Sequence, residues 1–275
     1  MPEGHSVFIH ARDHQKLLAG KKIAVTSPQG RFIDGAKIVD GKRLRRVYAH
    51  GKHLFYDFGP RAILHVHLGR LGRFREHSVS QGVVAPDPRS ACRVRLHAKD
   101  IAVDLSGPTA CEVLDQPHVD GIRARLGPDL LDPHADRNAV WQIVKRRATP
   151  IGALLMDQSV VSGIGNIFRA EILYLCKIHP STPARDLTRA QFDRLWKQSV
   201  KLLQVGVAVG LIVTIPLKSI TKPVKKLRRD ERFNVYRRKH CRGCGAEVKS
   251  VHLAGRPCFY CPKEQVLKNA LPKKM

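Results

Sequence analysis

Apolar residues recur at helical spacing at the start of the chain. Val7, Ala11 and Leu18 stand four and seven residues apart within residues 6–19, and polar residues fill most positions between them. This spacing predicts a short amphipathic helix, and Gly20 is a natural stop for it.

Helical spacing returns in the second half of the chain, where residues 130–206 are predicted to be all-α. Asn166–Lys177 carries one apolar face. Further on, Thr188 is followed three residues later by Gln191, the spacing of a capping box at a helix start. A helical domain is therefore expected here.

The region between these helices has a different pattern. Residues 21–115 contain short runs of β-prone residues separated by glycine, proline and aspartate, which favours a sandwich or barrel. A crevice between a β-rich half and a helical half would be a natural place for a substrate. The predicted strands are residues 22–26, 32–39, 44–48, 53–58, 62–68, 93–96 and 101–105, and residues 78–89 are expected to form a loop.

The charge balance narrows the class of partner. The chain has 49 Lys and Arg against 23 Asp and Glu, a net charge of +26, and residues 218–239 hold ten basic residues and two acidic ones. Such a charge attracts polyanions, of which nucleic acid is the usual one and an anionic membrane surface the weaker alternative. The longest nearly apolar run, residues 205–217, is too short to span a bilayer, and no signal peptide is visible. A cytoplasmic, nucleoid-associated protein is expected.

Four of the seven cysteines cluster near the end of the sequence in two CxxC pairs separated by thirteen residues. Four thiolates suit a tetrahedral structural zinc site, and the intervening segment has the length of a β-hairpin. The cysteines are Cys241, Cys244, Cys258 and Cys261, and His240, His252 and Glu264 are nearby substitutes if one thiol is not a ligand.

The first residues carry candidate chemistry. If Met1 is removed, Pro2 becomes a secondary amine with a pKa of roughly 8, partly neutral at pH 7 and able to attack a sugar carbon. The neighbouring Glu3 is placed to move protons. Taken alone, this is also an ordinary start of a protein.

Three glycine-containing turns add weaker signals, each compatible with a plain surface turn. Lys52, after Gly51, is positioned to neutralise a phosphate. Gly165 and Asn166 open a helix, where backbone amides can hold a phosphate. Finally, Arg70 and Leu71 form the tip of a loop whose long side chains could enter a base stack.

In combination these motifs resemble the bacterial formamidopyrimidine-DNA glycosylase and endonuclease VIII family over almost the whole chain. The string at residues 150–158 and the Pro-Glu-Gly-His start are most similar to the actinobacterial endonuclease VIII-like branch. The matching segments are residues 2–5, 51–54, 67–69, 155–158 and 163–171, with the cysteine hairpin.

The resemblance implies a multidomain α+β fold. Residues 1–125 would form an N-terminal catalytic β-sandwich with flanking helices. Residues 126–235 would form a helical domain with a helix–two-turns–helix motif and a basic loop, and residues 236–275 a zinc β-hairpin and tail. The zinc is expected to be structural, because a tetrathiolate site has no open position.

It also implies a bifunctional DNA glycosylase and AP lyase that acts on double-stranded DNA with damaged bases or abasic sites, and a monomer is expected because one duplex would fill the cleft. Pro2 would form a Schiff base at C1′ and Glu3 would act as the acid/base group, with β- and δ-elimination following. Lys52, Asn166 beside Gly165, and Arg256 at the hairpin tip would hold phosphates, and Arg70 and Leu71 would fill the gap left by the flipped base.

Two departures from the family pattern leave alternatives open. Sixteen residues separate Cys244 from Cys261, so Glu264 stands at the family's last cysteine position. Cys258 is favoured as the replacement ligand, with Glu264 or His252 as alternatives. Arg70 stands where the family more commonly has an apolar wedge residue. The preference for the base opposite the lesion therefore stays open.

The substrate class also stays open. Oxidised pyrimidines are favoured, and the alternative is an oxidised-purine enzyme acting on formamidopyrimidines or 8-oxoguanine. Lesion recognition is assigned to the loop at about residues 207–235. A hypothesis from another class is a non-catalytic, zinc-containing DNA-binding protein, which would have no need of the Pro2 amine.

Overall fold

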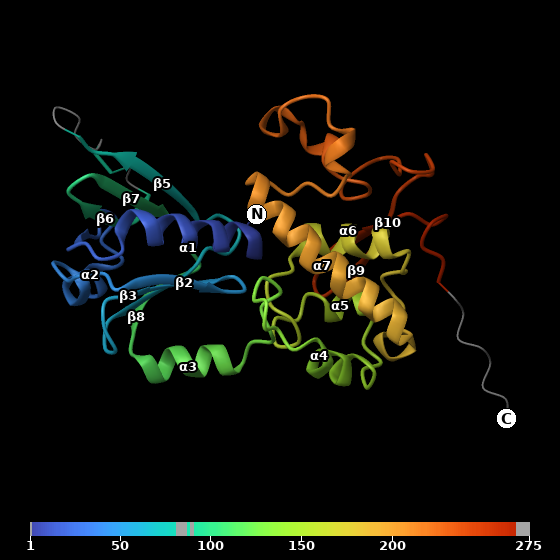
Figure 1. The fold of residues 1–275 in the computed structure, drawn as a ribbon, viewed down its shortest axis with the longest axis horizontal. Coiled ribbons are helices and arrows are strands. Elements are labelled where there is room, and N and C mark those ends of the chain that lie inside the picture. The colour runs from blue at the N-terminus through green and yellow to red at the C-terminus, as the bar shows by residue number, and fades with distance from the viewer. Residues whose placement is uncertain (1, 81–86, 89–90, 268–275) are drawn as a thin grey trace. The chain divides into compact units, whose positions relative to one another are not determined.

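The computed structural model describes residues 2–80, 87–88 and 91–267, which form two compact units, residues 1–125 and 126–275 (Figure 1). Each unit has a hydrophobic core of its own, and each is considered separately below.

The first unit is built around two four-stranded antiparallel sheets, as the β-prone runs predicted. Side chains from both sheets, among them Val94, Leu96, Leu54 and Leu64, share one buried core, which is the packing of a sandwich. One sheet has the order β1 (Ala24–Thr26), β6 (Cys92–Ala98), β7 (Ile101–Ser106), β5 (Arg73–Ser78), and the other has the order β2 (Arg46–His50), β3 (His53–Asp57), β4 (Ile63–His67), β8 (Ala110–Leu114).

Three helices accompany the sheets: α1 (Gly4–Leu18), α2 (Ile33–Val39) and α3 (Gln116–Ala124). α1 packs against β2 and β3, and the side chain of Gln15 accepts a hydrogen bond of 2.5 Å from the amide of Val47. Its buried face includes Val7, Ala11 and Leu18, the residues whose spacing predicted it. The N-terminal helix is therefore fixed to the second sheet.

The strand predicted at residues 32–39 is wrong, because α2 occupies this segment. Phe32, Ala36 and Val39 are the buried residues, and they stand four and three apart, which is helical spacing. A Cβ at Gly35 would lie 2.2 Å from the ring of Phe32, so any larger residue there would force this buried ring to move. The β-prone composition of the segment hid this periodicity.

The second unit is mainly helical, as expected for residues 130–206. α6 is the central helix: nine of its residues are buried, and Lys177 ends it in the left-handed conformation. The predicted capping box is confirmed at α7, where the amide of Gln191 donates to the Thr188 hydroxyl at 3.2 Å. The helices are α4 (Arg137–Val144), α5 (Ile151–Leu154), α6 (Asn166–Cys176) and α7 (Arg189–Val209), with short 3-10 turns η1 (Ala184–Asp186), η2 (Leu217–Ser219), η3 (Val224–Lys226) and η4 (Arg229–Glu231).

The hairpin of β9 (Lys249–Leu253) and β10 (Arg256–Tyr260) belongs to this unit by its contacts. β10 packs against α6, and Val251, Leu253 and Phe259 join the hydrophobic core of the unit. The hairpin is thus held by the same helix whose first turn carries Asn166.

A buried carboxylate on α6 binds the backbone at both ends of the segment that carries most of the basic residues of the region 218–239. Glu171 on α6 is 0% exposed, and its oxygens accept hydrogen bonds of 2.7–2.8 Å from the backbone amides of Asn234, Val235 and Tyr236. The hydroxyl of Thr214 donates to the same carboxylate at 2.5 Å. Both ends of the segment from Thr214 to Tyr236 are therefore tied to one point on α6, and the exposed basic turns lie between these ends.

Candidate active site and nucleic-acid interface

The N-terminal candidate residues stand directly before α1. Pro2 is half-buried and Glu3 is 0% exposed. The Ser6 hydroxyl accepts a hydrogen bond of 3.2 Å from the Glu3 amide and donates to its carbonyl at 2.9 Å, which fixes the first turn. A carboxyl group is therefore held in a buried position next to the residue whose amine is the candidate nucleophile.

Lys52 lies in the turn between β2 and β3, where Gly51 adopts φ 57°. His53, His65 and His67 lie beside it: Nδ1 of His53 is 2.9 Å from Nε2 of His65, and the rings of His53 and His67 are 4.9 Å apart. Burial, followed by the neighbouring histidines, lowers the pKa of His53 to about 3, and burial also lowers the pKa of His65 and His67. These imidazoles are neutral at pH 7, so they do not compete with Lys52 for an anion.

Acidification is expected to destabilise the first unit. Burial lowers the pKa of His5 to about 4 and that of His53 to about 3, whereas an unfolded histidine titrates near 6.5. Between these values the unfolded chain binds more protons, so the stability present above pH ~6.5 is lost as the pH falls towards 4. Each such histidine contributes at most about 1.4 kcal/mol per pH unit to this slope.

Urea unfolding followed between pH 7 and pH 4.5 measures this slope. His53→Asn is expected to reduce this slope by up to about 1.4 kcal/mol per pH unit, because it removes one of these histidines. A free energy of unfolding with the same pH dependence in His53→Asn and wild type would show that His53 does not resist protonation.

The loop between β4 and β5 presents Arg70 and Leu71. Both are exposed, and the side chain of Leu71 reaches 80% exposure. Gly69 has φ 61°, and a Cβ there would lie 1.8 Å from the hydroxyl oxygen of Thr109, so the loop can take this path only with glycine. The structure thus presents an apolar and a cationic side chain together at a tightly constrained tip.

In the second unit, Asn166 and the hairpin tip are brought together. The Asn166 side-chain amide donates to the carbonyl of Pro257 at 3.1 Å, next to Arg256. Arg169 is 0% exposed, and its guanidinium donates to the Leu253 carbonyl at 2.9 Å and to the side-chain oxygen of Asn166. Gly165 is the N-cap of α6. The N-terminal end of α6, which is the positive end of the helix dipole, therefore lies beside the hairpin segment that carries Arg256.

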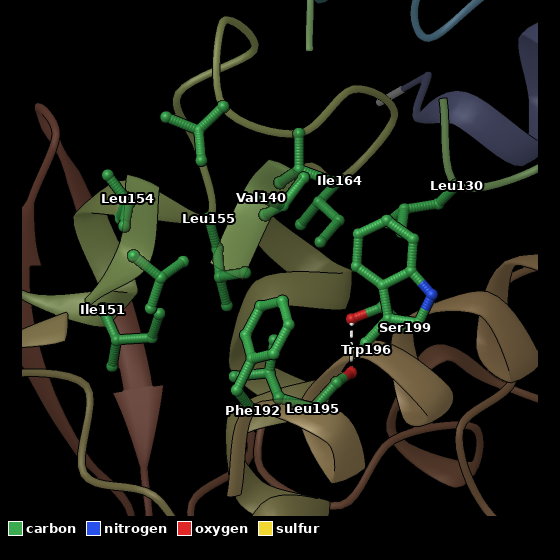
Figure 2. A pocket seen from close by; sticks show the side chains of 13 residues that line it. Leu130, Val140, Ile151, Leu154, Leu155, Ile164, Phe192, Leu195, Trp196 and Ser199 are labelled. Carbon is green, nitrogen blue, oxygen red and sulfur yellow. Dashed lines mark hydrogen bonds between the residues drawn. The ribbon is translucent and has the colours of Figure 1, made fainter. Parts of the chain in front are cut away.

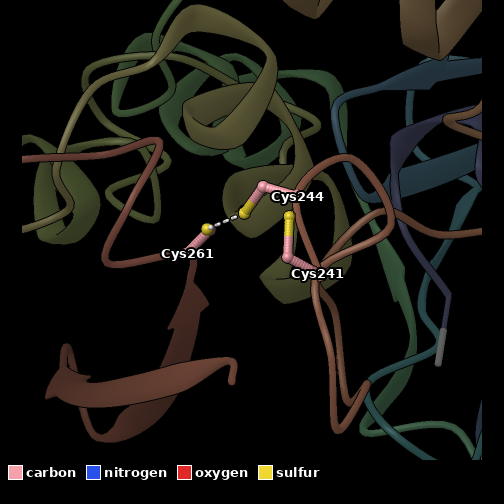
Figure 3. A group of neighbouring side chains, drawn as sticks. All are labelled: Cys241, Cys244 and Cys261. Carbon is pink, nitrogen blue, oxygen red and sulfur yellow. Dashed lines mark hydrogen bonds between the residues drawn. The ribbon is translucent and has the colours of Figure 1, made fainter. Parts of the chain in front are cut away.

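Three of the four predicted metal ligands converge (Figure 3). The sulfur atoms of Cys241, Cys244 and Cys261 lie within 4.8 Å of one another, and those of Cys244 and Cys261 are 3.4 Å apart. Cys258 is placed elsewhere: it is 0% exposed in the hydrophobic core, and burial raises the pKa of its thiol to about 11. The structure therefore supplies three thiolate ligands for a metal at this point.

One cavity of the helical core is too small to hold a substrate. Figure 2 shows apolar side chains converging on it from α4, α5 and α7, and its volume is about 20 Å³. The polar side-chain atoms drawn are the indole nitrogen of Trp196 and the hydroxyl of Ser199, and this hydroxyl donates to the carbonyl of Leu195 at 2.8 Å. A space for about one water molecule with an almost wholly apolar lining is a packing void.

Comparison with known protein families identifies the family of this chain. The model of the formamidopyrimidine-DNA glycosylase N-terminal domain matches residues 1–109, and that of the formamidopyrimidine-DNA glycosylase H2TH domain matches residues 126–216. The chain belongs to the formamidopyrimidine-DNA glycosylase family. The resemblance seen in the sequence is thereby confirmed, with its α+β fold of N-terminal sheets and a helical domain and its enzyme class of DNA glycosylase with AP lyase activity.

Individual relatives cover nearly all of the chain. Endonuclease 8 1 of Mycobacterium tuberculosis is 40% identical over 264 residues, which are 95% of this chain and 98% of the relative. Formamidopyrimidine-DNA glycosylase of Latilactobacillus sakei is 27% identical over 297 residues, with 98% and 100% coverage. The solved structure of the Lactococcus lactis formamidopyrimidine-DNA glycosylase, bound non-covalently to DNA containing an AP site, has the same fold, with a TM-score of 0.79 at 23% identity over 97% of this chain and 100% of that one.

Within the described residues, no helix is both long and apolar enough to cross a membrane. The sequence did not identify the charged groups that organise the second unit, Arg169 and Glu171, because the partners of both are far away along the chain. Two buried charges in an otherwise apolar helix are the signal that would have revealed them.

Proposed function

We propose that this protein is a bifunctional base-excision enzyme that removes oxidised bases from duplex DNA through the amine of Pro2. The observation that carries the proposal is the start of α1, where the buried carboxyl of Glu3 adjoins Pro2 at the N-terminal end of a helix that is fixed to the sheet. Family membership adds the enzyme class.

In the proposed reaction the Pro2 nitrogen, with Met1 removed, attacks C1′ of the damaged nucleoside. A bond forms between this nitrogen and C1′, and the ring oxygen of the sugar leaves C1′ as the base departs, so that an iminium results. The iminium acidifies the C2′ proton, and removal of this proton expels the 3′ phosphate in β-elimination. δ-Elimination then expels the 5′ phosphate. Glu3 is the group proposed to donate and accept protons in these steps.

The flipped nucleotide that this chemistry requires costs a few kcal/mol of unstacking. We propose that Lys52 in the first unit, and Asn166 with Arg256 in the second, bind backbone phosphates on either side of the lesion. Arg70 and Leu71 at the exposed loop tip are proposed to fill the vacated stack. Phosphate contacts of this kind make the affinity strongly salt-dependent.

Oxidised pyrimidines are the proposed lesion class, and oxidised purines are the alternative. The first is supported by the higher identity to Endonuclease 8 1, 40%, than to a formamidopyrimidine-DNA glycosylase, 27%. Recognition of the lesion is proposed for the loop predicted at about residues 207–235, of which residues 207–209 end α7 and the part from Thr214 is held on α6 by Glu171.

A structural zinc ion is proposed at Cys241, Cys244 and Cys261, with Glu264 as the fourth ligand in place of Cys258. The Cys241 sulfur accepts hydrogen bonds from the backbone amides of Gly243 and Cys244, and the Cys261 sulfur accepts them from those of Lys263 and Glu264. Two equivalent turns result, and Glu264 occupies in the second turn the position that Cys244 occupies in the first. Its carboxylate lies 3.1 Å from the ammonium of Lys177, a pair that zinc binding would break.

Cobalt substitution tests this ligand set. Cys258→Ala is expected to retain the thiolate-to-Co²⁺ charge-transfer absorption at full intensity, whereas Cys261→Ala loses much of it. Glu264→Ala keeps three thiolates and the band, but its metal affinity falls by at least about 10-fold. Loss of the band in Cys258→Ala, with wild-type affinity in Glu264→Ala, would restore Cys258 as the ligand.

The proposed function is tested by reductive trapping with borohydride. Untagged protein, shown by intact mass to lack Met1, is mixed with duplexes containing dihydrouracil, 8-oxoguanine or an abasic site. A covalent protein–DNA band with the abasic duplex establishes amine catalysis, and the faster of the two damaged-base duplexes identifies the lesion class. If folded protein binds these duplexes and gives no band with any of them, the chain is a DNA-binding protein without the chemistry.

A further inference from the structure

Three side chains of the first unit converge on one point without a role in the reaction above. His10 and His14 lie on α1, and Glu76 lies on β5. Their nearest ligand atoms all lie within 4.8 Å of one another. Nε2 of His14 is 3.1 Å from a carboxylate oxygen of Glu76, and Nδ1 of His10 is 3.9 Å from the same oxygen.

The spacing along the chain explains why the two imidazoles meet. Residues four apart lie on one face of a helix, so His10 and His14 stand one above the other on α1. The ring of Phe74, two residues before Glu76 on β5, lies 4.9 Å from the ring of His10 and 4.8 Å from that of His14. This apolar contact limits the rotation of both imidazoles and keeps them beside the carboxylate.

The second nitrogen of the buried histidine is already engaged. Nδ1 of His14 lies 2.6 Å from the hydroxyl of Tyr56, a residue that is 0% exposed. Only Nε2 of His14 therefore faces the cluster. Metal-binding histidines characteristically have their other nitrogen held by such an outer partner, which fixes the ring and selects the ligating nitrogen.

The separations also fit a small ion. Two ligand atoms about 2.1 Å from a metal at a tetrahedral angle are about 3.4 Å apart, and the measured 3.1 and 3.9 Å bracket this value. The side chains of Glu76 and His10 are 42% and 25% exposed, whereas that of His14 is 0% exposed. The site is thus rigid on its inner side and open to solvent on its outer side.

We propose that His10, His14 and Glu76 form a second metal site, for one divalent first-row cation of the Zn²⁺ type, with water at the open position. Two imidazole nitrogens and one carboxylate oxygen suit zinc and its neighbours and do not suit Mg²⁺ or Ca²⁺, which take oxygen ligands. The bound ion joins α1 to β5. It therefore stabilises the helix that begins directly after Pro2 and Glu3, and it does so whether or not the proposed glycosylase chemistry is correct.

Zinc stoichiometry tests the proposal. Untagged full-length wild type and the variants His10→Asn and Glu76→Gln are equilibrated with micromolar Zn²⁺, and the bound metal is counted by mass spectrometry after gel filtration. Wild type is expected to bind one equivalent more than either variant. The matched control is His118→Asn, which breaks an exposed histidine–aspartate pair on α3 with a separation of 2.5 Å and is expected to bind as much zinc as wild type.

Two further readouts separate this site from the cysteine site and from misfolding. The thiolate-to-Co²⁺ band is expected to be unchanged in His10→Asn and Glu76→Gln, because the cysteines belong to the other unit. With chelator present, all variants are expected to unfold at similar temperatures. Added Zn²⁺ is then expected to raise the unfolding temperature of wild type and His118→Asn by more than that of His10→Asn and Glu76→Gln, which keep only the cysteine site. Equal zinc content in wild type, His10→Asn and Glu76→Gln would overturn the proposal and leave the cluster as a hydrogen-bonded network.

Discussion

Blocking the amine of Pro2 is expected to reduce both borohydride trapping and strand nicking to background while DNA binding remains. A short tag before Pro2 converts its nitrogen into an amide, which is not nucleophilic at any accessible pH. Pro2→Gly keeps an amine but loses the ring that fixes its direction, and a misplacement of about 1 Å is enough to lower the rate by about 100-fold. Single-turnover nicking of an abasic duplex measures both effects.

The comparison depends on showing that the variants still bind DNA. The phosphate-binding residues proposed above do not include Pro2, so the affinity for an uncleavable abasic duplex is expected to stay within about threefold of wild type. Nicking at the wild-type rate by the tagged protein would assign the nucleophile to another residue. Loss of nicking and of binding together, in a protein with an altered circular dichroism spectrum, would show that residue 2 supports the fold instead.

Local signals predicted the parts of this molecule whose cause is local. The helix at Thr188 follows from a side chain that caps its own first turn. The strands of the sandwich follow from alternating burial, which β6 shows over seven residues. In both cases the residues that decide the structure are neighbours in the sequence, so a pattern search finds them.

The segment at residues 32–39 shows where this approach fails. Its β-prone side chains favoured a strand, but burying Phe32, Ala36 and Val39 on one face required a helix. β5 was not predicted for the opposite reason: Arg73–Ser78 is mostly polar and half-exposed, so it has little apolar pattern. The tertiary environment outweighed intrinsic preference at both places.

The residues of the candidate site also divide into those with a local sequence signal and those without one. Pro2, Lys52 and Asn166 could be predicted as candidates because short motifs surround them. The sequence could not show which way the side chains of the hairpin face: Cys258 is 0% exposed in the hydrophobic core and is not among the three cysteines whose sulfur atoms converge. The cluster of His10, His14 and Glu76 joins a helix to a strand about sixty residues away, so no motif records it.

Replacing Arg169 with methionine is expected to lower the free energy of unfolding of the second unit by about 3 kcal/mol or more. Arg169 is 0% exposed and donates to the carbonyls of Gly152 and Leu253 at 3.1 and 2.9 Å. Methionine fills much of the same volume but donates no hydrogen bond. Each buried carbonyl left without a donor costs about 1–3 kcal/mol. Chemical unfolding of the full chain, followed by Trp141 and Trp196 fluorescence, measures the loss.

The same substitution is expected to weaken DNA binding, because Arg169 holds Asn166 on one side and the hairpin carbonyls of Arg256 and Pro257 on the other. Amide hydrogen exchange should therefore rise in β9 and β10 before it rises in α7. Arg185→Met is the matched control: it removes the same charge from a side chain that is 60% exposed and is expected to change stability by less than about 0.5 kcal/mol. If Arg169→Met had the same free energy of unfolding as this control, the hairpin would be held by its apolar contacts with α6. The proposed phosphate-binding surface at Asn166 and Arg256 would then not depend on the buried guanidinium.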